Sequence, residues 1–275
     1  MNCVVTGATS GIGKETAVAL AKSGATVAIV CRTRERGERA LGEIARRAGR
    51  DAVSLFVADL SSQRAVRTVA AELRAALPRI DVLVNNAGLA LRDRIPTQDG
   101  LETTFAVNHL APFLLTRLLE PTLAASAPAR VVTVSSEAHR WGTMRFDDLM
   151  GAQRYDGWKA YAQSKLANVL FTYELARRLQ GQGVTANCLH PGLVGTAFAS
   201  RGPTAIRILA RLARPFLRSP AKGAATSVYL AASPEVAEVT GGYFTGRRAR
   251  RSSRESYDPA VAARLWQMSE QLTGA

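Results

Sequence analysis

Tyr161 and Lys165 are four positions apart in Tyr-Ala-Gln-Ser-Lys, the stretch that opens a predicted helix running to about Leu179. Because four residues make about one helical turn, the phenol and the ammonium are expected to project from the same face. A fixed positive charge beside a phenol favours the phenolate and lowers the tyrosine pKa from its usual value of about 10. Tyr161 could therefore donate and accept a proton near neutral pH. The Tyr-x-x-x-Lys spacing alone also occurs by chance.

A glycine-rich turn follows the first predicted strand, 2–6. Thr6-Gly-Ala-Thr-Ser-Gly-Ile-Gly13 runs into a helical pattern from Lys14 to about Ser23. Glycines at such a turn let the backbone approach a pyrophosphate, and the amides at the helix N-terminus bind the anion. The spacing is Gly-x-x-x-Gly-x-Gly rather than Gly-x-Gly-x-x-Gly, but the strand before it and the helix after it supply the required context.

The second predicted strand, 26–30, is followed by Cys31-Arg32 and has no carboxylate at its end. NAD-binding sheets usually place an acidic residue there to hold the ribose 2′-hydroxyl, whereas an arginine can pair with a 2′-phosphate. Arg32 therefore favours NADP(H) over NAD(H), and Lys14 and Arg34 would add positive charge. The alternative for Arg32 is a solvated loop arginine.

Polar and small residues follow the next two predicted strands, 52–57 and 81–84. Asp59, which precedes Leu60, either caps the next helix, 62–76, or accepts a hydrogen bond from an adenine amino group. Asn85-Asn86-Ala87-Gly88 ends the fourth strand, and its small residues allow a ligand to approach the backbone closely. Both groups are expected at the carboxyl edge of a parallel sheet, where ligands bind.

Two further polar positions are candidates for chemistry. Asn108 lies in an otherwise apolar helical pattern, 100–123, so it is either a hydrogen-bonded core residue or part of a proton path. Pro112 is expected to kink this helix and to free backbone groups near Asn108. Ser135 and Ser136 end the fifth predicted strand, 130–134.

Two stretches have the composition of a substrate enclosure. The first, between Ser136 and Tyr161, forms either a substrate wall or ordinary core, and its large apolar residues are Trp141, Met144, Phe146, Tyr155 and Trp158. The second, 197–218, has apolar residues at helical spacing with arginines between them. It predicts an amphipathic substrate lid, with binding to a membrane surface as the alternative.

Strands and helices alternate along the whole chain. Later strands are predicted at 184–190 and 241–244, and later helices at 219–232 and 259–272. Such alternation calls for a parallel sheet covered on both faces, with right-handed crossovers. We expect an α/β fold with a doubly wound, seven-stranded parallel sheet flanked by helices. It would form a single domain, 1–275, of which 245–275 are a C-terminal extension.

The composition argues against several classes of protein. No apolar run reaches about 18 residues, so no transmembrane helix is expected. The first residues run straight into a strand, which leaves no room for a signal peptide or N-terminal anchor. Cys3, Cys31 and Cys188 have no paired spacing and are expected to be buried thiols in a reducing cytoplasm. The histidines have no metal-ligand spacing, so no metal site is expected.

The formal net charge is +14, and arginines are dense in Gly246-Arg-Arg-Ala-Arg-Arg-Ser-Ser-Arg254. A run of this kind binds nucleic acid, an anionic membrane or an acidic partner, or it is a solvated loop. It has no interleaved aromatic residues and matches no nucleic-acid motif. The solvated loop is therefore preferred, and no nucleic-acid partner is expected.

Six motifs occur in an order and at a spacing that resemble the classical short-chain dehydrogenase/reductases from end to end. They are Thr-Gly-x-x-x-Gly-Ile-Gly, Asn-Asn-Ala-Gly, the asparagine of the fourth helix, the strand-end serine, Tyr-x-x-x-Lys and Pro-Gly-x-x-x-Thr. Finer matches, such as Val-Asn-His-Leu and Cys-Arg after the second strand, resemble the retinol dehydrogenase and WW-domain oxidoreductase-like branch. Members of that branch commonly carry an N-terminal extension or anchor that the first residues here do not show. The sequences of Ala111-Pro112 and of the predicted lid also differ from those typical of the branch. We therefore do not expect this chain to share the branch's specificity for retinoids.

The resemblance implies a role for each matching residue. Tyr161 would protonate the carbonyl oxygen during reduction, Lys165 would lower the Tyr161 pKa and bind the nicotinamide ribose, and Ser136 would hydrogen-bond the substrate oxygen. Asn108 would hold a water that links Lys165 to solvent. The implied cofactor contacts are Gly7, Thr9, Ser10, Gly11, Ile12, Gly13, Arg32, Asp59, Leu60, Asn86, Ala87, Gly88, Tyr161, Lys165, Pro191, Gly192, Val194 and Thr196.

The expected activity is NADP(H)-dependent interconversion of an aldehyde or ketone and an alcohol on a lipophilic small molecule, by a cytoplasmic carbonyl reductase. Two alternatives stay open. One is a regulatory protein that binds NADP(H) without turnover, and the other is a reductase for an intermediate that is bound to an acidic carrier protein or bears an anionic group. The resemblance also implies a homodimer or homotetramer, because family members often associate through their fourth and fifth helices.

Overall fold

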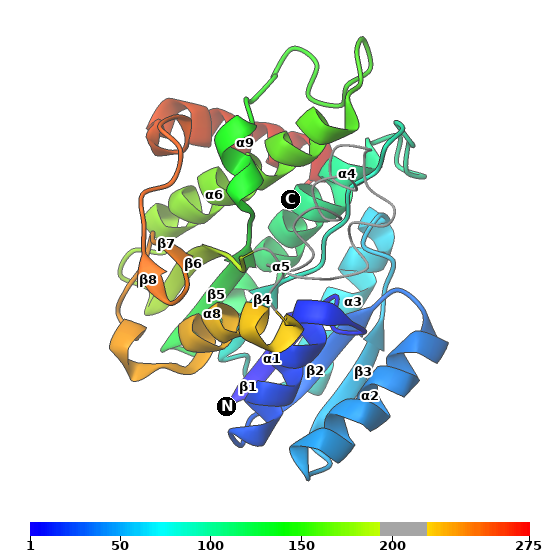
Figure 1. Ribbon diagram of the computed structural model, residues 1–275, viewed down its shortest axis with the longest axis vertical. Coiled ribbons are helices and arrows are strands. Elements are labelled where there is room, and N and C mark those ends of the chain that lie inside the picture. Colours follow the sequence, from blue (N-terminus) through cyan, green and yellow to red (C-terminus); the bar gives the residue numbers. More distant parts are fainter. Residues whose placement is uncertain (193–218) are drawn as a thin grey trace.

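The computed structural model describes residues 1–192 and 219–275 of the chain. Their strands form one sheet in the order β3-β2-β1-β4-β5-β6-β7-β8, with helices on both faces (Figure 1). The predicted lid, 197–218, and the predicted binding residues Val194 and Thr196 lie outside the described residues. The strands are β1 (Asn2–Thr6), β2 (Thr26–Cys31), β3 (Val53–Val57), β4 (Val82–Asn85), β5 (Ala129–Val134), β6 (Val184–His190), β7 (Tyr243–Thr245) and β8 (Arg248–Ala249).

The seven predicted strands are all present and pair in parallel, which confirms the doubly wound α/β class. The eighth strand was not predicted. β8 folds back antiparallel on β7, so that Thr245 pairs with Arg248. Gly246 and Arg247 between them have φ values of 58° and 63°, the left-handed conformation of a tight hairpin turn. Part of the basic run is therefore a strand rather than a loop.

The strands are almost continuously apolar because helices cover both faces of the sheet. Successive side chains point to opposite faces, so Val4 packs with α3, α5 and α6, whereas Cys3 and Val5 pack with α1, α2 and α8. The three cysteines are buried free thiols, as predicted. Within the described ranges, no helix has the length and apolar composition needed to cross a bilayer. The helices on the two faces are α1 (Gly11–Lys22), α2 (Arg34–Ala48), α3 (Gln63–Ala76), α5 (Ala111–Ala125), α6 (Gly157–Arg178) and α8 (Pro220–Ala232).

Helix α6 begins four residues before Tyr161, earlier than predicted. The Asp156 side chain caps it by accepting the Lys159 amide hydrogen (2.9 Å). Tyr161 therefore lies in the second turn of the helix, where the backbone is hydrogen-bonded on both sides. Similarly, α1 begins at Gly11 rather than Lys14, because Gly11 and Gly13 of the turn already belong to the helix.

The predicted helix 100–123 is divided into three pieces. A short α4 (Thr103–Phe105) is followed by a π-helical turn, η1 (Ala106–Leu110), and then by α5. The π turn contains Asn108 and ends two residues before Pro112, which has no amide hydrogen to donate to the Asn108 carbonyl. The break expected at Pro112 thus takes the form of a π turn rather than a simple kink.

The C-terminal helix α9 (Pro259–Thr273) packs on α6 and completes one core. The buried Trp266 ring lies 5.0 Å from Phe113 and 6.0 Å from Phe171, between ring centroids. The Arg178 guanidinium lies 4.3 Å from the Trp266 ring centroid, a cation–π contact. The indole N–H donates to Glu270 (2.8 Å), so both the apolar and the polar parts of Trp266 have partners.

Replacing Trp266 with alanine is expected to lower the free energy of unfolding by about 3–5 kcal/mol, because neighbouring helices fill only part of the resulting cavity. Chemical denaturation followed by circular dichroism measures the change. Trp141→Ala is the matched control: the Trp141 side chain is 64% exposed. Its loss is expected to change the unfolding free energy by no more than about 0.5 kcal/mol. Equal effects of the two substitutions would exclude α9 from the cooperative core.

Candidate active site

Tyr161 and Lys165 lie one turn apart on the same face of α6, as predicted. Both side chains are buried, and Lys165 Nζ lies 5.8 Å from the centroid of the Tyr161 ring. The same ammonium donates to the carbonyl of Val134 at the end of β5 (3.0 Å). The pair therefore lies at the carboxyl edge of the sheet, the edge at which α/β proteins bind ligands.

The two serines after β5 have different surroundings. Ser135 is buried and donates to the carbonyl of Lys165 (2.7 Å), so it ties β5 to α6. The Ser136 hydroxyl is close enough to the Tyr161 phenol to lower its pKa. It also accepts the Ala138 amide hydrogen (3.2 Å) at the start of a short helix, η2 (Glu137–Trp141). Ser136 is therefore the serine of this pair that faces the phenol.

Asn108 is fully buried, and its side-chain amide is engaged by protein groups. It accepts from the Leu89 amide and donates to the Leu89 carbonyl (2.8 Å each), and it donates to Ser164 (2.9 Å). Ser164 in turn donates to the carbonyl of Tyr161 (2.7 Å). The Asn108 side chain therefore holds the loop after β4 against α6. The sequence did not indicate a role for Ser164, because it occupies one of the unspecified positions of the Tyr-x-x-x-Lys motif.

The glycine turn is held against the end of β4. Gly7 has a φ of 69°, which favours glycine, and a side chain on Gly13 would meet the Gly7 carbonyl oxygen at 2.5 Å. Asn86 donates to the carbonyl of Thr6 (2.8 Å), while Thr6 Oγ1 accepts the Asn86 amide hydrogen (3.0 Å). Thr6 is a second residue that sequence reasoning missed. These contacts place the turn between β1 and β4, where the strand order reverses.

The N-terminus of α1 opens from this turn. Ser10 occupies the position before the helix with extended backbone and makes no side-chain hydrogen bond to the first turn. Amides at an uncapped helix N-terminus attract an anion. On the other side of the turn, a side chain on Gly88 would meet Asn108 Oδ1 and Lys165 Nζ at 3.3 Å each. The backbone after β4 therefore runs close beside the lysine.

Arg32 and Asp59 follow neighbouring strands. Cys31 of β2 pairs with Val57 of β3, so the two polar residues leave the sheet at the same edge. One Asp59 carboxylate oxygen accepts from the amide and hydroxyl of Ser61 (3.0 and 2.8 Å). The cap of α3 is Ser62 rather than Asp59. Arg32 is exposed and forms no ion pair within residues 1–192 and 219–275.

The two extra cations expected near the cofactor face carboxylates of the protein instead. Lys14 pairs with Glu43 of α2 (2.8 Å). Arg34 pairs with Glu38 one turn along α2 (3.7 Å). Their positive charge is therefore partly compensated, and Arg32 is left as the main cation at the end of β2.

Burial sets the pKa values of the reactive pair. It raises the pKa of Tyr161 to about 12, an effect that the nearby Ser136 hydroxyl partly opposes. It also lowers the pKa of Lys165 to about 8. The sequence argument predicted a lowered tyrosine pKa from the lysine charge alone. Desolvation acts in the opposite direction and dominates, so the phenol is protonated at neutral pH, the state that a proton donor requires.

The aromatic interval before Tyr161 divides between core and site. Met144 and Phe146 pack in a core cluster with α6 and α9, so they are not part of a substrate wall. Trp158 lies 6.2 Å from the Tyr161 ring, and the exposed Trp141 lies 6.2 Å from Trp158, between ring centroids. These two tryptophans form an aromatic row that runs from the surface to the reactive phenol.

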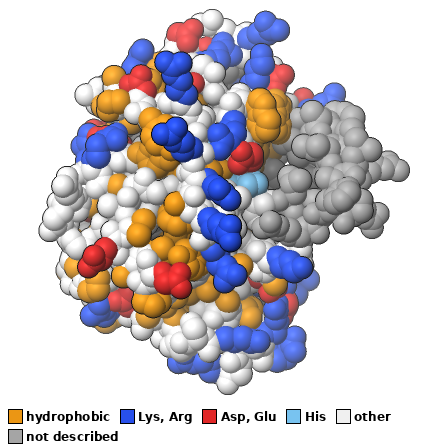
Figure 2. Space-filling view, turned by 60° about the vertical axis from the view of Figure 1, so that its left-hand side comes forward, with side chains coloured by type: hydrophobic (Ala, Val, Ile, Leu, Met, Phe, Trp, Pro, Cys, Tyr) orange, Lys and Arg blue, Asp and Glu red, His pale blue; other side chains and the backbone are white. Residues whose placement is uncertain are grey.

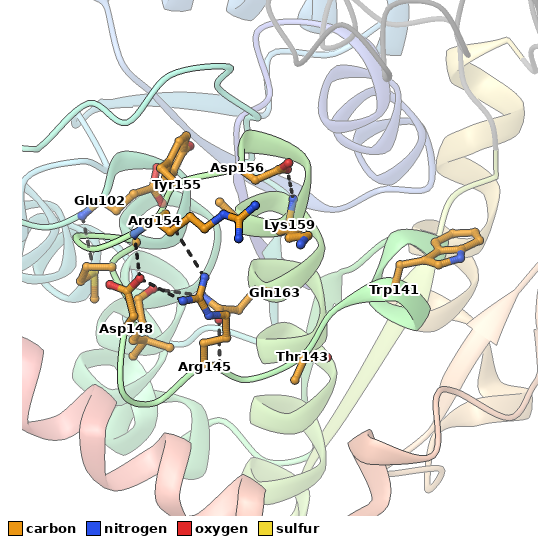
Figure 3. A pocket seen from close by; sticks show the side chains of 14 residues that line it. Glu102, Trp141, Thr143, Arg145, Asp148, Arg154, Tyr155, Asp156, Lys159 and Gln163 are labelled. Carbon is orange, nitrogen blue, oxygen red and sulfur yellow. Dashed lines mark hydrogen bonds and ion pairs between the residues drawn. The ribbon is translucent and has the colours of Figure 1, made fainter.

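A cavity of about 240 Å³ lies beside the same interval (Figure 3). It is lined from α6 by Lys159 and Gln163, each two residues from Tyr161 and therefore on the other side of the helix. The polar groups of its loop side satisfy one another: Asp148 pairs with Arg145 (3.1 Å), and Gln163 accepts the Arg145 amide hydrogen (3.0 Å). This cavity is separate from the reactive pair.

The basic run lies on the β7–β8 hairpin and the segment after it. Lys and Arg side chains gather along the middle of the face that this part of the molecule brings forward (Figure 2). The arginines of 247–254 are exposed and make no ion pair with any described residue. Their charge is therefore free to act on an anionic partner or to be solvated, and both interpretations stay open.

Comparison with known proteins identifies the class. Residues 2–205 match the short chain dehydrogenase family. The chain belongs to the short-chain dehydrogenases. Human retinol dehydrogenase 14 is 42% identical over 98% of this dehydrogenase and 85% of its own length. Mouse retinol dehydrogenase 12 is 44% identical over the same shares of the two chains. The dehydrogenase therefore lies in the retinol dehydrogenase branch, and its family interconverts carbonyl and alcohol groups.

Solved structures agree with this assignment. An uncharacterised protein from Mycobacterium paratuberculosis superposes with a TM-score of 0.81 at 36% identity, covering 100% of this dehydrogenase and 93% of that chain. A short chain dehydrogenase from Shigella flexneri complexed with NADP superposes with a TM-score of 0.71 at 29% identity, covering 90% and 97%. The sheet and the flanking helices described above are therefore those of the family.

The rate of carbonyl reduction is expected to fall as the pH rises through about 8, because Lys165 loses its charge there while Tyr161 keeps its proton up to about 12. Initial rates measured between about pH 6 and pH 10 test this, with circular dichroism and cofactor binding at each pH as controls for folding and affinity. A rate that stays constant to the alkaline limit would mean that the Lys165 charge is not needed.

Proposed function

We propose that this dehydrogenase is an NADP(H)-dependent carbonyl reductase for lipophilic aldehydes or ketones. The observation that carries the proposal is the buried Tyr161 phenol one turn from the Lys165 ammonium at the end of β5, with Ser136 close enough to lower the phenol pKa. The nicotinamide cofactor supplies the hydride when bound. The residues of the chain bind and orient both reactants and deliver the proton.

The proton comes from Tyr161. The Ser136 hydroxyl is close enough to the phenol for both to hydrogen-bond one substrate oxygen, and Tyr161 donates its proton as negative charge develops there. The Lys165 ammonium then stabilises the phenolate that remains. One of its three N–H groups is used by Val134, which leaves the others for the ribose hydroxyls of the cofactor.

The Asn108 backbone, rather than its side chain, suits the return path of the proton. The side-chain amide is committed to Leu89 and Ser164. Pro112 cannot donate to the Asn108 carbonyl, so that oxygen lacks its α-helical partner and is suited to hold a water beside Lys165. The family resemblance implies that Asn108 holds a water, and its main-chain carbonyl is the group that we propose for this role.

The glycine turn and the strand ends fit the cofactor. The uncapped N-terminus of α1, with the turn from Gly7 to Gly13, suits the pyrophosphate. Arg32 suits a 2′-phosphate, and the second carboxylate oxygen of Asp59 suits the adenine amino group. Asn86 to Gly88 would pack near the adenosine ribose. Pro191 and Gly192, which follow β6, lie at the same sheet edge and suit the nicotinamide end.

The aromatic row supports a lipophilic substrate. Trp158 and Trp141 offer flat apolar surface between Tyr161 and solvent, and aromatic side chains contribute large contact areas with apolar ligands. The three buried free thiols fit a reducing compartment such as the cytoplasm.

Tyr161→Phe is expected to lower kcat for an accepted carbonyl substrate by about 10²- to 10⁴-fold, because the variant has no proton to donate. NADPH affinity is measured alongside, so that loss of turnover is separated from any loss of cofactor contact. NADPH oxidation over a panel of aldehydes and ketones measures the turnover. Tyr155→Phe is the matched control, since it removes a phenol hydroxyl that donates to Glu102 (3.1 Å) outside the site. Full turnover by Tyr161→Phe would overturn the assignment, and tight NADPH binding by the unaltered protein without any turnover would favour the regulatory alternative.

Arg32→Ala is expected to weaken NADPH binding by about 10- to 100-fold, the loss of a charge-assisted hydrogen bond of about 1.5–3 kcal/mol. NADH binding should change little, because NADH has no 2′-phosphate. Fluorescence titration with the two cofactors measures both affinities. Arg36→Ala, which removes an exposed arginine of the neighbouring helix α2, serves as the control for net charge. An equal loss for both cofactors would argue against recognition of the 2′-phosphate by Arg32.

A further inference from the structure

We propose that His139 is a positioning residue that holds the substrate-facing Ser136 in place by joining it to the C-terminal segment 250–257. The inference rests on the proposed function, because it concerns how Ser136 reaches the substrate oxygen. It adds to that function a residue and a segment that do not themselves touch substrate or cofactor.

Two groups of His139 hydrogen-bond with the Ser136 carbonyl oxygen. It is fully buried in η2, three residues after Ser136. Its backbone amide donates to the Ser136 carbonyl (3.1 Å), and its ring nitrogen Nδ1 lies 2.7 Å from the same oxygen. On the far side of the ring, Nε2 accepts the amide hydrogen of Ser253 (3.0 Å). One imidazole thus spans from the reactive serine to the C-terminal segment.

The two partners determine the protonation state of the ring. A carbonyl oxygen only accepts, so Nδ1 of His139 must carry a hydrogen. The Ser253 amide only donates, so Nε2 must present its lone pair. Both conditions are met by the neutral imidazole with its proton on Nδ1 and by no other form. A protonated ring would direct an N–H at the Ser253 amide, and burial lowers the pKa of His139 away from that state.

The C-terminal segment is itself anchored, so it can act as a fixed support. The Ser252 hydroxyl hydrogen-bonds with the Tyr173 hydroxyl of α6 (2.7 Å) and with Ser256 (2.6 Å). Arg140 of η2 donates to the carbonyl of Arg251 (2.5 Å). The segment is therefore tied both to the helix that carries Tyr161 and to the turn that carries Ser136.

The His139 ring has little freedom to move. Tyr243 of β7 packs against it with 4.8 Å between ring centroids. The Tyr243 hydroxyl donates to the Glu137 carboxylate (3.1 Å), and the Glu137 amide donates to Nδ1 of His190 (3.1 Å). The peptide that carries Ser136 is thus held from the ends of β6 and β7 as well as from its own strand.

Loss of the His139 bonds is expected to affect catalytic turnover and not cofactor binding. Reacting groups must be held within about 0.5 Å of the productive geometry. Loss of the bond from Nδ1 leaves the Ser136 carbonyl with the His139 backbone amide alone, which loosens the position of the serine hydroxyl beside the phenol. The glycine turn and Arg32 follow β1 and β2, in the other half of the strand order from β5, so cofactor binding should be unaffected. A disturbed His139 should lower kcat without changing the affinity for NADPH.

Two amide substitutions separate the two bonds of the ring. His139→Asn places an amide N–H near Nδ1 and can keep the bond to the Ser136 carbonyl, but it does not reach Ser253. His139→Gln places an acceptor near Nε2 and keeps the bond to Ser253, but it has no donor at Nδ1. We expect His139→Gln to lower kcat at least about 10-fold and His139→Asn less than about 3-fold, with NADPH affinity unchanged in both, because a lost hydrogen bond of about 1–1.5 kcal/mol corresponds to about that factor.

Melting temperature is measured alongside kcat. The inference fails if kcat falls in proportion to the melting temperature, whether or not the bond to the Ser136 carbonyl is kept. It also fails if the two variants lose the same activity, because His139 then has only a structural role. His139→Phe keeps a ring beside Tyr243 and removes both bonds. It replaces the glutamine variant should that variant not fold, and it is expected to show the same loss of kcat.

A double-mutant cycle distinguishes this inference from the proposed function. On a Ser136→Ala background, His139→Gln should cause no further loss of kcat, because its effect passes through the serine. If Ser136→Ala alone keeps full kcat, the proposed role of Ser136 fails. If Ser136→Ala lowers kcat and His139→Gln multiplies that loss by its full single-mutant factor, the proposed function stands and the positioning role of His139 fails.

Discussion

A reciprocal clamp between the end of β5 and helix α6 is the contact on which the rest of the site depends. The Lys165 ammonium donates to the Val134 carbonyl, and Ser135 donates to the Lys165 carbonyl. The two bonds run in opposite directions between the same two elements, so they set both the rotation of α6 and its height above the sheet. In that register the Tyr161 phenol faces the Ser136 hydroxyl.

The clamp is formed in a dry interior, and this has a chemical effect. A buried ammonium has lost most of its hydration and is compensated by the Val134 carbonyl and by the phenol beside it. A buried phenol holds its proton more tightly than one in water. The resting pair is therefore a protonated acid beside a cation that loses its charge readily. That arrangement suits proton delivery to a carbonyl better than proton removal from an alcohol, and it is the physical basis for proposing reduction.

The cofactor end and the reactive end of the site are organised by different contacts. Thr6 and Asn86 tie the glycine turn to β4 at the point where the strand order reverses. The Asn108 side chain then joins the loop after β4, through Leu89, to α6, through Ser164. Beyond the sheet, the hairpin β7–β8 and the segment leading to α9 return to the turn after Ser136. The C-terminal part of the chain therefore supports the reactive end rather than the cofactor end.

Much of the fold could be predicted because its signals are local. Apolar strands, glycine stops and the Ser219-Pro220 helix start each depend on residues within a few positions of one another, and all seven parallel strands follow from them. The errors also have local causes. β8 is only two residues long, the Asp156 cap moved the start of α6, and Pro112 was accommodated by a π turn because a wider turn leaves room for a ring without an amide hydrogen.

The sequence by itself determined the residue types and their order: the glycine turn, the strand-end serines, the Tyr161–Lys165 spacing and the arginine at the end of β2. The tertiary structure alone decided which serine faces the phenol, which way the tyrosine pKa moves, and that the Asn108 side chain is already engaged. It also decided that His139 meets Ser253, 114 positions away. The physical reason is that hydrogen-bond partners and desolvation depend on what packs around a group. Those neighbours come from distant parts of the chain, whereas spacing and periodicity report only the local backbone.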